Sequence, residues 1–167
     1  MRTAIIGGGI ATLFTVSSLV LAAPAAAEER TCRGSIGATT LDNVRVPQGA
    51  TCRLEGTTVQ GTIKIENNAR LYATDIRVIG NIQGEGHRRV DVQRSRVGGS
   101  IQLVQGEAAL LRNNNVGQDV QSFENSATQR FTLNRINGNL QCKENTPKPT
   151  GGQNTVGGNK EDQCANL

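Results

Sequence analysis

The stretch "SRVGGSIQL", residues 95–103, returns in altered form as "NRINGNLQC" at 134–142 and as "NTVGGNKEDQC" at 154–164. When its valine is taken as an anchor, the same phrase can be followed through most of the chain. The anchors lie 19, 19, 19, 20 and 20 residues apart and are Val59, Val78, Val97, Val116, Ile136 and Val156. A fixed period near twenty residues is typical of a solenoid, in which each repeat forms one coil.

Other positions of the repeat keep a fixed distance from the anchors. Glycine stands two residues after most anchors, as at Gly80 and Gly99, and an aliphatic residue stands four after, as at Ile82 and Ile101. We expect the glycines to form corners in backbone conformations that other residues resist. The alternation between corners predicts three short strands per coil. The predicted fold class is therefore all-β, a parallel β-helix of about seven coils with 19–20 residues per coil.

Residues at the same position in successive coils form a column, because each strand lies beside the same strand of the next coil, about 4.8 Å away. Asn114, Asn134 and Asn154 share the column two residues before their anchors, so we expect a hydrogen-bonded asparagine ladder. In the last coil Lys160 and Asp162 replace aliphatic residues, which predicts a polar terminal coil.

The four cysteines, Cys32, Cys52, Cys142 and Cys164, allow three disulfide pairings. Cys32 and Cys52 lie about one coil apart at one end of the solenoid, and Cys142 and Cys164 lie about one coil apart at the other. We expect each neighbouring pair to form a disulfide that staples an open end. A zinc site is not expected, because no C-x-x-C occurs and His87 is the only histidine.

Residues 1–27 are expected to be a signal peptide. Arg2 is followed by a long apolar run and then by Ala25, Ala26 and Ala27, which fit the small-residue rule for signal peptidase. The alternative is an uncleaved anchor, because the stretch is nearly long enough to span a bilayer. Cleavage would leave residues 28–167 as one parallel β-helix domain, secreted and without a membrane span, in a compartment where cysteines are oxidised.

The composition narrows the set of partners. The formal charge of the chain is +4, and it would be +3 without Arg2. Because the charges are few and interspersed, no nucleic-acid partner is expected. The chain has one Tyr, three Phe and no Trp. Base-stacking platforms and aromatic shelves for sugar rings are therefore not expected either.

The repeated "VGGN" phrase gives the chain a likeness to a known group of proteins. It resembles small secreted bacterial proteins of the right-handed parallel β-helix superfamily, of the kind found in actinobacteria. In architecture alone it is similar to pectate lyases. The resemblance covers residues 31–164 and implies right-handed coils and export, but no particular activity.

A polysaccharide lyase or hydrolase is the alternative function. Enzymes of the pectate-lyase kind need clustered carboxylates for calcium and an arginine base on one strand face. Here Asp75, Asp91 and Asp119 fall in different columns, and His87 has no evident Ser or Asp partner. We therefore expect no catalytic residue, no metal ligand and no cofactor.

The first candidate interaction surface is the series of variable polar loops, such as "ENNAR" at 66–70 and "EGHRR" at 85–89, that leave the third strand of each coil. Solenoids commonly bind at such places, although plain solvated turns have the same composition. We call this series the loop ridge. Its candidate residues are Glu66, Arg70, Glu85, His87, Arg88 and Arg89.

A second candidate surface is the stripe of Arg77, Arg96 and Arg135, each directly before an anchor. Such a stripe suits an anionic cell-wall polymer, and plain solvated surface is again the alternative. Together these features predict an exported, non-catalytic module, structural or binding, that is extracellular or held at the cell surface. Its expected partner is a polysaccharide or a protein.

Overall fold

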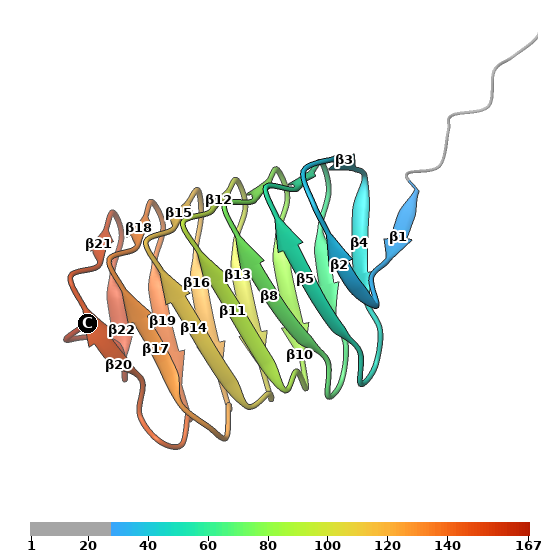
Figure 1. The fold of residues 1–167 in the computed structure, drawn as a ribbon. Coiled ribbons are helices and arrows are strands. Elements are labelled where there is room, and N and C mark those ends of the chain that lie inside the picture. The colour runs from blue at the N-terminus through green and yellow to red at the C-terminus, as the bar shows by residue number, and fades with distance from the viewer. Residues whose placement is uncertain (1–27) are drawn as a thin grey trace, which may run out of the picture.

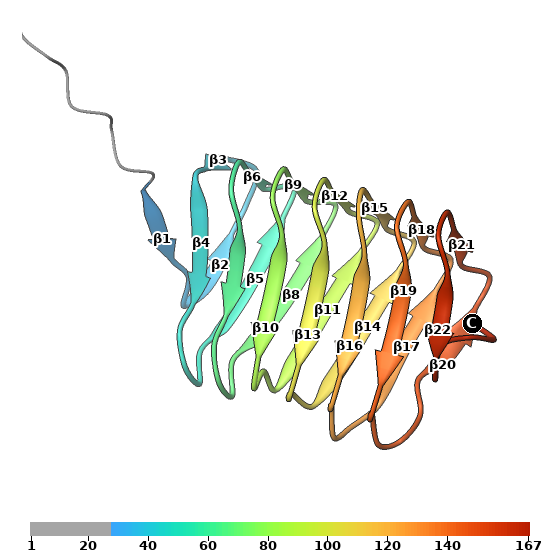
Figure 2. The same ribbon diagram turned by 180° about the vertical axis from the view of Figure 1, so that it is seen from behind.

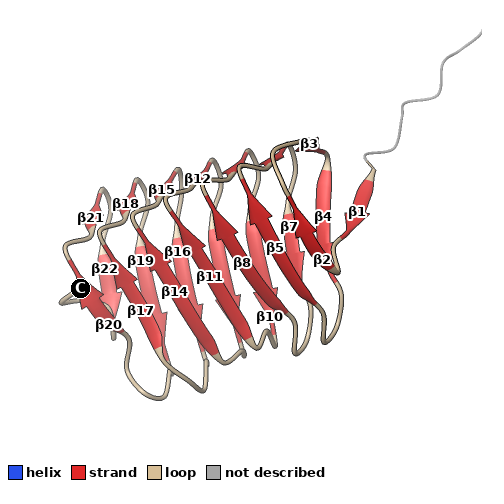
Figure 3. Cartoon of the chain, in the orientation of Figure 1, coloured by secondary structure: helices blue, strands red, loops and turns tan. Residues whose placement is uncertain are grey.

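The computed structural model describes residues 28–167, which form a parallel β-solenoid of about seven turns without any helix (Figures 1 and 3). The predicted signal peptide, residues 1–27, lies outside the described residues. Each coil gives one strand to each of three sheets, which confirms the predicted fold class. Within residues 28–167 no helix is long and apolar enough to cross a membrane.

The three sheets are parallel and run the length of the solenoid. Sheet A contains β1 (Glu29–Thr31), β4 (Asn43–Val46), β7 (Ile63–Ile65), β10 (Ile82–Glu85), β13 (Ile101–Val104), β16 (Val120–Phe123), β19 (Leu140–Lys143) and β22 (Lys160–Asp162). Sheet B contains β2 (Gly34–Ile36), β5 (Thr51–Glu55), β8 (Arg70–Thr74), β11 (Arg89–Gln93), β14 (Ala108–Arg112), β17 (Gln129–Thr132) and β20 (Thr150–Gly152). Sheet C contains β3 (Thr40–Leu41), β6 (Thr58–Val59), β9 (Arg77–Val78), β12 (Arg96–Val97), β15 (Asn115–Val116), β18 (Arg135–Ile136) and β21 (Thr155–Val156).

Sheets A and B are the two broad faces, and sheet C runs along one edge between them. Figure 1 is seen from the side of sheet B, and Figure 2, turned by 180°, is seen from the side of sheet A. Within each sheet the strands pair in the register that the repeat predicts, so that Ile82 lies between Ile63 and Ile101. Each surface feature is therefore a column that runs along the solenoid.

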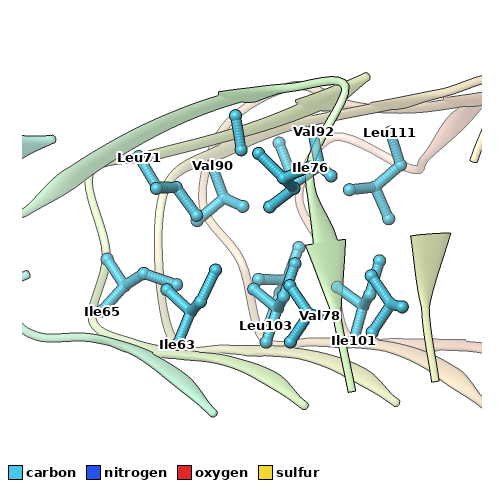
Figure 4. Packing of buried hydrophobic residues seen from close by; sticks show 14 of the residues in the cluster. Ile63, Ile65, Leu71, Ile76, Val78, Val90, Val92, Ile101, Leu103 and Leu111 are labelled. Carbon is cyan, nitrogen blue, oxygen red and sulfur yellow. The ribbon is translucent and has the colours of Figure 1, made fainter. Parts of the chain in front are cut away.

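The core is a stack of aliphatic side chains between sheets A and B. Ile63, Ile65, Ile101 and Leu103 point inward from sheet A and meet side chains such as Leu71 from sheet B (Figure 4). All of them are essentially inaccessible to solvent. Burying one such side chain stabilises a fold by roughly 1.5–3 kcal/mol. Many small repeated contacts therefore build the core, in which Phe131 is the one fully buried Phe or Tyr side chain among the described residues.

The corner glycines differ from the prediction in their physical role. Gly99 does not have a positive φ angle, so its corner needs no left-handed conformation. A Cβ atom there would instead overlap Oδ1 of Asn81 and lie 2.8 Å from the carbonyl oxygen of Gly80. Glycine is required because successive corners stack in direct contact. The left-handed residues lie in other columns, one of which is Gly56, Asp75, Arg94, Asn113, Leu133 and Gln153.

Replacing Gly99 by Val is expected to lower the free energy of unfolding by about 1–3 kcal/mol, because the new side chain has to displace the neighbouring corner. Urea denaturation measures the change. Gly37→Val is the matched control, since Gly37 has nothing within 4 Å of an added Cβ and no positive φ. An equal effect of the two substitutions would show that contact between corners is not what selects glycine.

The predicted asparagine ladder is confirmed and buried. Nδ2 of Asn114 donates to Oδ1 of Asn134 at 3.0 Å, and Nδ2 of Asn134 donates to Oδ1 of Asn154 at 3.0 Å. A second ladder, which we did not predict, lies on the opposite edge. There Nδ2 of Asn125 donates to Oδ1 of Asn145 at 2.9 Å. The two ladders satisfy backbone groups where the chain turns and no sheet hydrogen bond is available.

The ends are closed as predicted. Cys32 bonds to Cys52 and Cys142 bonds to Cys164, with Cα–Cα distances of 5.5 and 5.3 Å. Each bond joins neighbouring coils at one end of the solenoid, where fraying would begin. Disulfides of this kind are typical of extracellular proteins. The last coil is polar, with the side chains of β22 largely exposed.

Candidate functional site

His87, predicted as the central residue of the loop ridge, is buried inside the solenoid. In the turns from sheet A to sheet B that follow β4 to β19, one residue has a positive φ angle, and the residue that follows it points inward. Gly86 is the left-handed residue of this turn, so His87 takes the inward position that Ala69 holds one coil earlier. A surface role for His87 is therefore wrong.

Two glycines make room for the imidazole ring of His87. A Cβ atom on Gly84 would lie 3.0 Å from its Nδ1, and a Cβ atom on Gly106 would overlap the ring. Within the described part of the chain neither ring nitrogen has a hydrogen-bond partner. Burial lowers the pKa of His87 to about 4, and the nearby backbone of Gly84 offsets only part of this effect. His87 is thus neutral at ordinary pH.

The other basic candidate residues of the loop ridge are Arg70, Arg88 and Arg89. Arg70 and Arg89 are paired in the register of β8 and β11. The guanidinium of Arg89 lies 3.6 Å from a carboxylate oxygen of Asp91, and that of Arg88 lies 3.9 Å from Glu107. Both ion pairs are long, and the pair of Arg88 with Glu107 is exposed, so they add little stability.

Glu66 is engaged elsewhere. Its Oε1 accepts a hydrogen bond from Arg45 at 3.2 Å, and its Oε2 accepts one from the backbone N–H of Gln48 at 3.0 Å. The hydrogen bond from Arg45 lowers the pKa of Glu66, with the Gln48 bond acting in the same direction. Glu66 thus fastens its turn to the preceding coil. Of the predicted surface residues, Glu85 is the one that lines the groove described next.

A shallow groove of about 520 Å³ runs along the outer face of sheet A, across β10, β13 and β16. Figure 2 shows this face toward the viewer. One wall is a ladder of glutamine side chains, in which Nε2 of Gln83 donates to Gln102 at 2.9 Å. Gln102 donates to Gln121 at 3.0 Å, and Gln121 donates to Gln141 at 2.9 Å. We call this series the glutamine ladder.

The other wall of the groove changes from charged to apolar along the solenoid. Glu85, Val104 and Phe123 form one column in the register of sheet A. Val104 and Phe123 are half-buried, so each leaves an apolar surface open to the groove. On the glutamine wall, Lys64 precedes Gln83 in the same column and adds a positive charge at the end nearer the N-terminus. The groove is thus lined by amide side chains on one side and mainly by apolar side chains on the other.

The glutamine ladder keeps spare hydrogen-bonding capacity. A glutamine amide has two N–H donors and two lone pairs on its oxygen. In the ladder Gln102 uses one donor and one lone pair, and Gln121 does the same. Each coil therefore still offers one donor and one acceptor, repeated about every 4.8 Å along the groove. Hydroxyl groups, which donate and accept, are the natural complement of such a surface.

The sequence holds a signal for this groove that we did not use. Gln83, Gln102, Gln121 and Gln141 each stand five residues after an anchor, and exposed positions have no packing reason to repeat one residue. Phe123 could not be found in the same way, because it is the only aromatic residue of its column. Its contribution to a wall depends on which residues neighbouring coils place beside it.

Asp75, Asp91 and Asp119 lie in different columns, and each has a partner of its own. Asp75 binds Arg94, Asp91 accepts a hydrogen bond from the Gln93 side chain, and Asp119 accepts one from a backbone N–H. Among residues 28–167 no group of three or more His, Cys, Asp or Glu side chains is placed to hold a metal ion.

Comparison with known proteins gave no relative. The chain matches no family model, no curated protein and no solved structure. The candidate site therefore has to be argued from its own chemistry.

Proposed function

We propose that this chain is an exported, non-catalytic binding module that holds a polysaccharide chain along the groove of sheet A. The observation that carries the proposal is the glutamine ladder facing an apolar column. Sugar rings combine hydroxyl groups around their rim with C–H surfaces on their faces. The amides of Gln102 and Gln121 suit the hydroxyls, and Val104 and Phe123 suit the apolar faces.

The shape of the site supports a polymer rather than a small ligand. The groove is open and follows the solenoid axis, and its hydrogen-bonding groups repeat with each coil. A repeating surface has the same symmetry as a repeating chain, so several sugar units would make similar contacts. Each contact is weak, and affinity would come from their number.

Export rests on two further observations. The predicted signal peptide would direct the chain out of the cytoplasm, and the two disulfides suit an oxidising compartment. A protein partner for the loop ridge, where Arg70, Arg88 and Arg89 gather, stays a prediction.

The test is binding of the disulfide-bonded protein to neutral polysaccharides, using β-glucan, xylan and mannan as probes in affinity electrophoresis. Phe123→Ala is expected to weaken binding by about tenfold, because it removes the largest apolar surface of the groove. Gln102→Ala, which interrupts the glutamine ladder at its middle, is expected to weaken binding as well.

Tyr72→Ala is the matched control, because Tyr72 is a half-buried aromatic residue on sheet B, under the guanidinium of Arg53. Equal losses from Phe123→Ala and Tyr72→Ala would place the binding surface outside the groove. Release of reducing or unsaturated sugar ends by the purified protein would instead favour the alternative, a polysaccharide lyase or hydrolase.

A further inference from the structure

A second polar surface lies where sheet B passes into sheet C, on the other side of the solenoid from the groove. Sheet C runs along the upper edge of Figure 1, where β12, β15 and β18 are labelled. In these strands Arg96, Asn115 and Arg135 are paired in register, one above the other. Arg77 precedes Arg96 in the same column. The predicted arginine stripe is thus a true column of the solenoid.

Two hollows flank this column at the same corner. One, of about 390 Å³, is lined by Arg96 and Arg135 with Asn115 between them. The other, of about 270 Å³, lies against Arg112 on the side of sheet B. Asn113 and Leu133 line both hollows, as does Arg94. We call this set, Arg94, Arg96, Arg112, Asn113, Asn115, Leu133 and Arg135, the arginine corner.

Three of the four arginines in the arginine corner have no acidic partner in residues 28–167. Arg94 is held by Asp75 through two hydrogen bonds of 3.0 Å. Arg96, Arg112 and Arg135 are exposed and form no salt bridge with any residue of the described chain. Among the described residues neither hollow is lined by a carboxylate. Asn115 separates Arg96 from Arg135 in their column, and no acidic side chain that the structure describes is paired with either of them, so the corner carries a charge that its own fold does not use.

Leu133 is a second feature that the fold does not explain. It is exposed over 43% of its surface and has a φ angle of 59°. A bulky residue in this left-handed region is an outlier, whereas the preceding coil has Asn113, which tolerates it. Five other coils have a positive φ at the same position, so the turn itself requires it. What is particular to this coil is the exposed leucine, which places an apolar side chain among guanidinium groups.

We propose that the arginine corner is a second binding site, which takes an anionic polysaccharide through its carboxylate or sulfate groups. Guanidinium groups match such oxyanions with two parallel hydrogen bonds each. Arg96 and Arg135 are two strand spacings apart, about 10 Å, and would hold successive anionic groups of one polymer. Leu133 would contact the C–H face of the sugar between them.

This inference does not depend on the groove of sheet A, since the two sites lie on different sides of the solenoid. With both sites occupied, one molecule would bridge a neutral and an anionic polysaccharide. A single-stranded nucleic acid fits the corner less well, because no aromatic residue lines either hollow among the described residues, and unpaired bases need stacking partners.

The test uses the disulfide-bonded protein with alginate, which carries carboxylates, dextran sulfate, which carries sulfates, and neutral dextran. The double variant Arg96→Gln, Arg135→Gln is expected to lose about tenfold in affinity for the anionic polymer that binds. Arg30→Gln, Arg33→Gln is the matched control, because it removes the same charge at exposed positions of the first coil. Binding of alginate alone or of dextran sulfate alone identifies the anionic group.

Leu133→Asn separates binding from structure. It restores the residue type of the preceding coil, so we expect a higher unfolding midpoint together with weaker polysaccharide binding. Higher stability with unchanged binding would overturn the role of Leu133. Three other results would each overturn the proposal. They are equal losses of affinity from the two arginine double variants, binding of neutral dextran as tightly as the anionic polymers, and tighter binding of duplex DNA. Loss of neutral-polysaccharide binding in the sheet A variants, with the corner intact, affects only the proposed function.

Discussion

Replacing Asn134 by Leu is expected to lower the free energy of unfolding by about 4 kcal/mol. The Asn134 side chain accepts hydrogen bonds from the backbone N–H and from Nδ2 of Asn114, and it donates to Asn154 and to the carbonyl of Leu111. All of these groups are buried. Leucine fills a similar volume but leaves them without partners, and each buried polar group without a partner costs about 1–3 kcal/mol.

Urea denaturation of a graded series measures this effect. Asn134→Ser should cost roughly half as much, because Ser95 holds the same column and its Oγ still accepts the backbone N–H of Ile76 at 3.2 Å. Asn137→Ala, an exposed change in the same coil, should cost less than about 0.5 kcal/mol. If Asn134→Leu is as stable as the wild type, the ladder does not hold the coils together.

Acidification from pH 7 to pH 4 is expected to remove roughly 3 kcal/mol of stability through His87 alone. The pKa of His87 is lowered from 6.5 to about 4 in the folded chain, because burial disfavours the charged ring. Well above pH 6.5 neither state binds the proton, so stability does not change. As the pH falls from 6.5 to 4, the unfolded chain binds a proton that the folded chain excludes, and stability falls.

The variant His87→Phe tests this expectation. Phenylalanine keeps a flat ring between Gly84 and Gly106 but cannot titrate. Between pH 7 and pH 5 the wild type should lose about 2 kcal/mol more than the variant. The chain has a single histidine, so no other imidazole titrates in this window. Most of the window also lies above the pH range in which carboxylates titrate. Parallel pH profiles of the two proteins would mean that His87 is accessible to solvent in the folded state.

Some features could be predicted because coil neighbours in space are residues about twenty apart in the sequence. The disulfides, the ladder of Asn114, Asn134 and Asn154, and the polar last coil all follow from reading the columns. The glutamine ladder follows the same rule and was overlooked. Gly99 lies at a corner, as predicted, but the predicted reason is wrong. Glycine is required there by contact with the preceding coil and not by its own φ angle.

The sequence by itself determined the period, the three strands of each coil and the pairs of residues that stack, because in-register parallel stacking turns a spacing along the chain into a contact. Only the tertiary structure decided which way the turn residues point. A left-handed residue at Gly86 sends His87 inward, although its polar neighbours suggested a surface position. The groove beside Phe123 and the hollows beside Leu133 likewise depend on three or more coils at once, so no single repeat contains them.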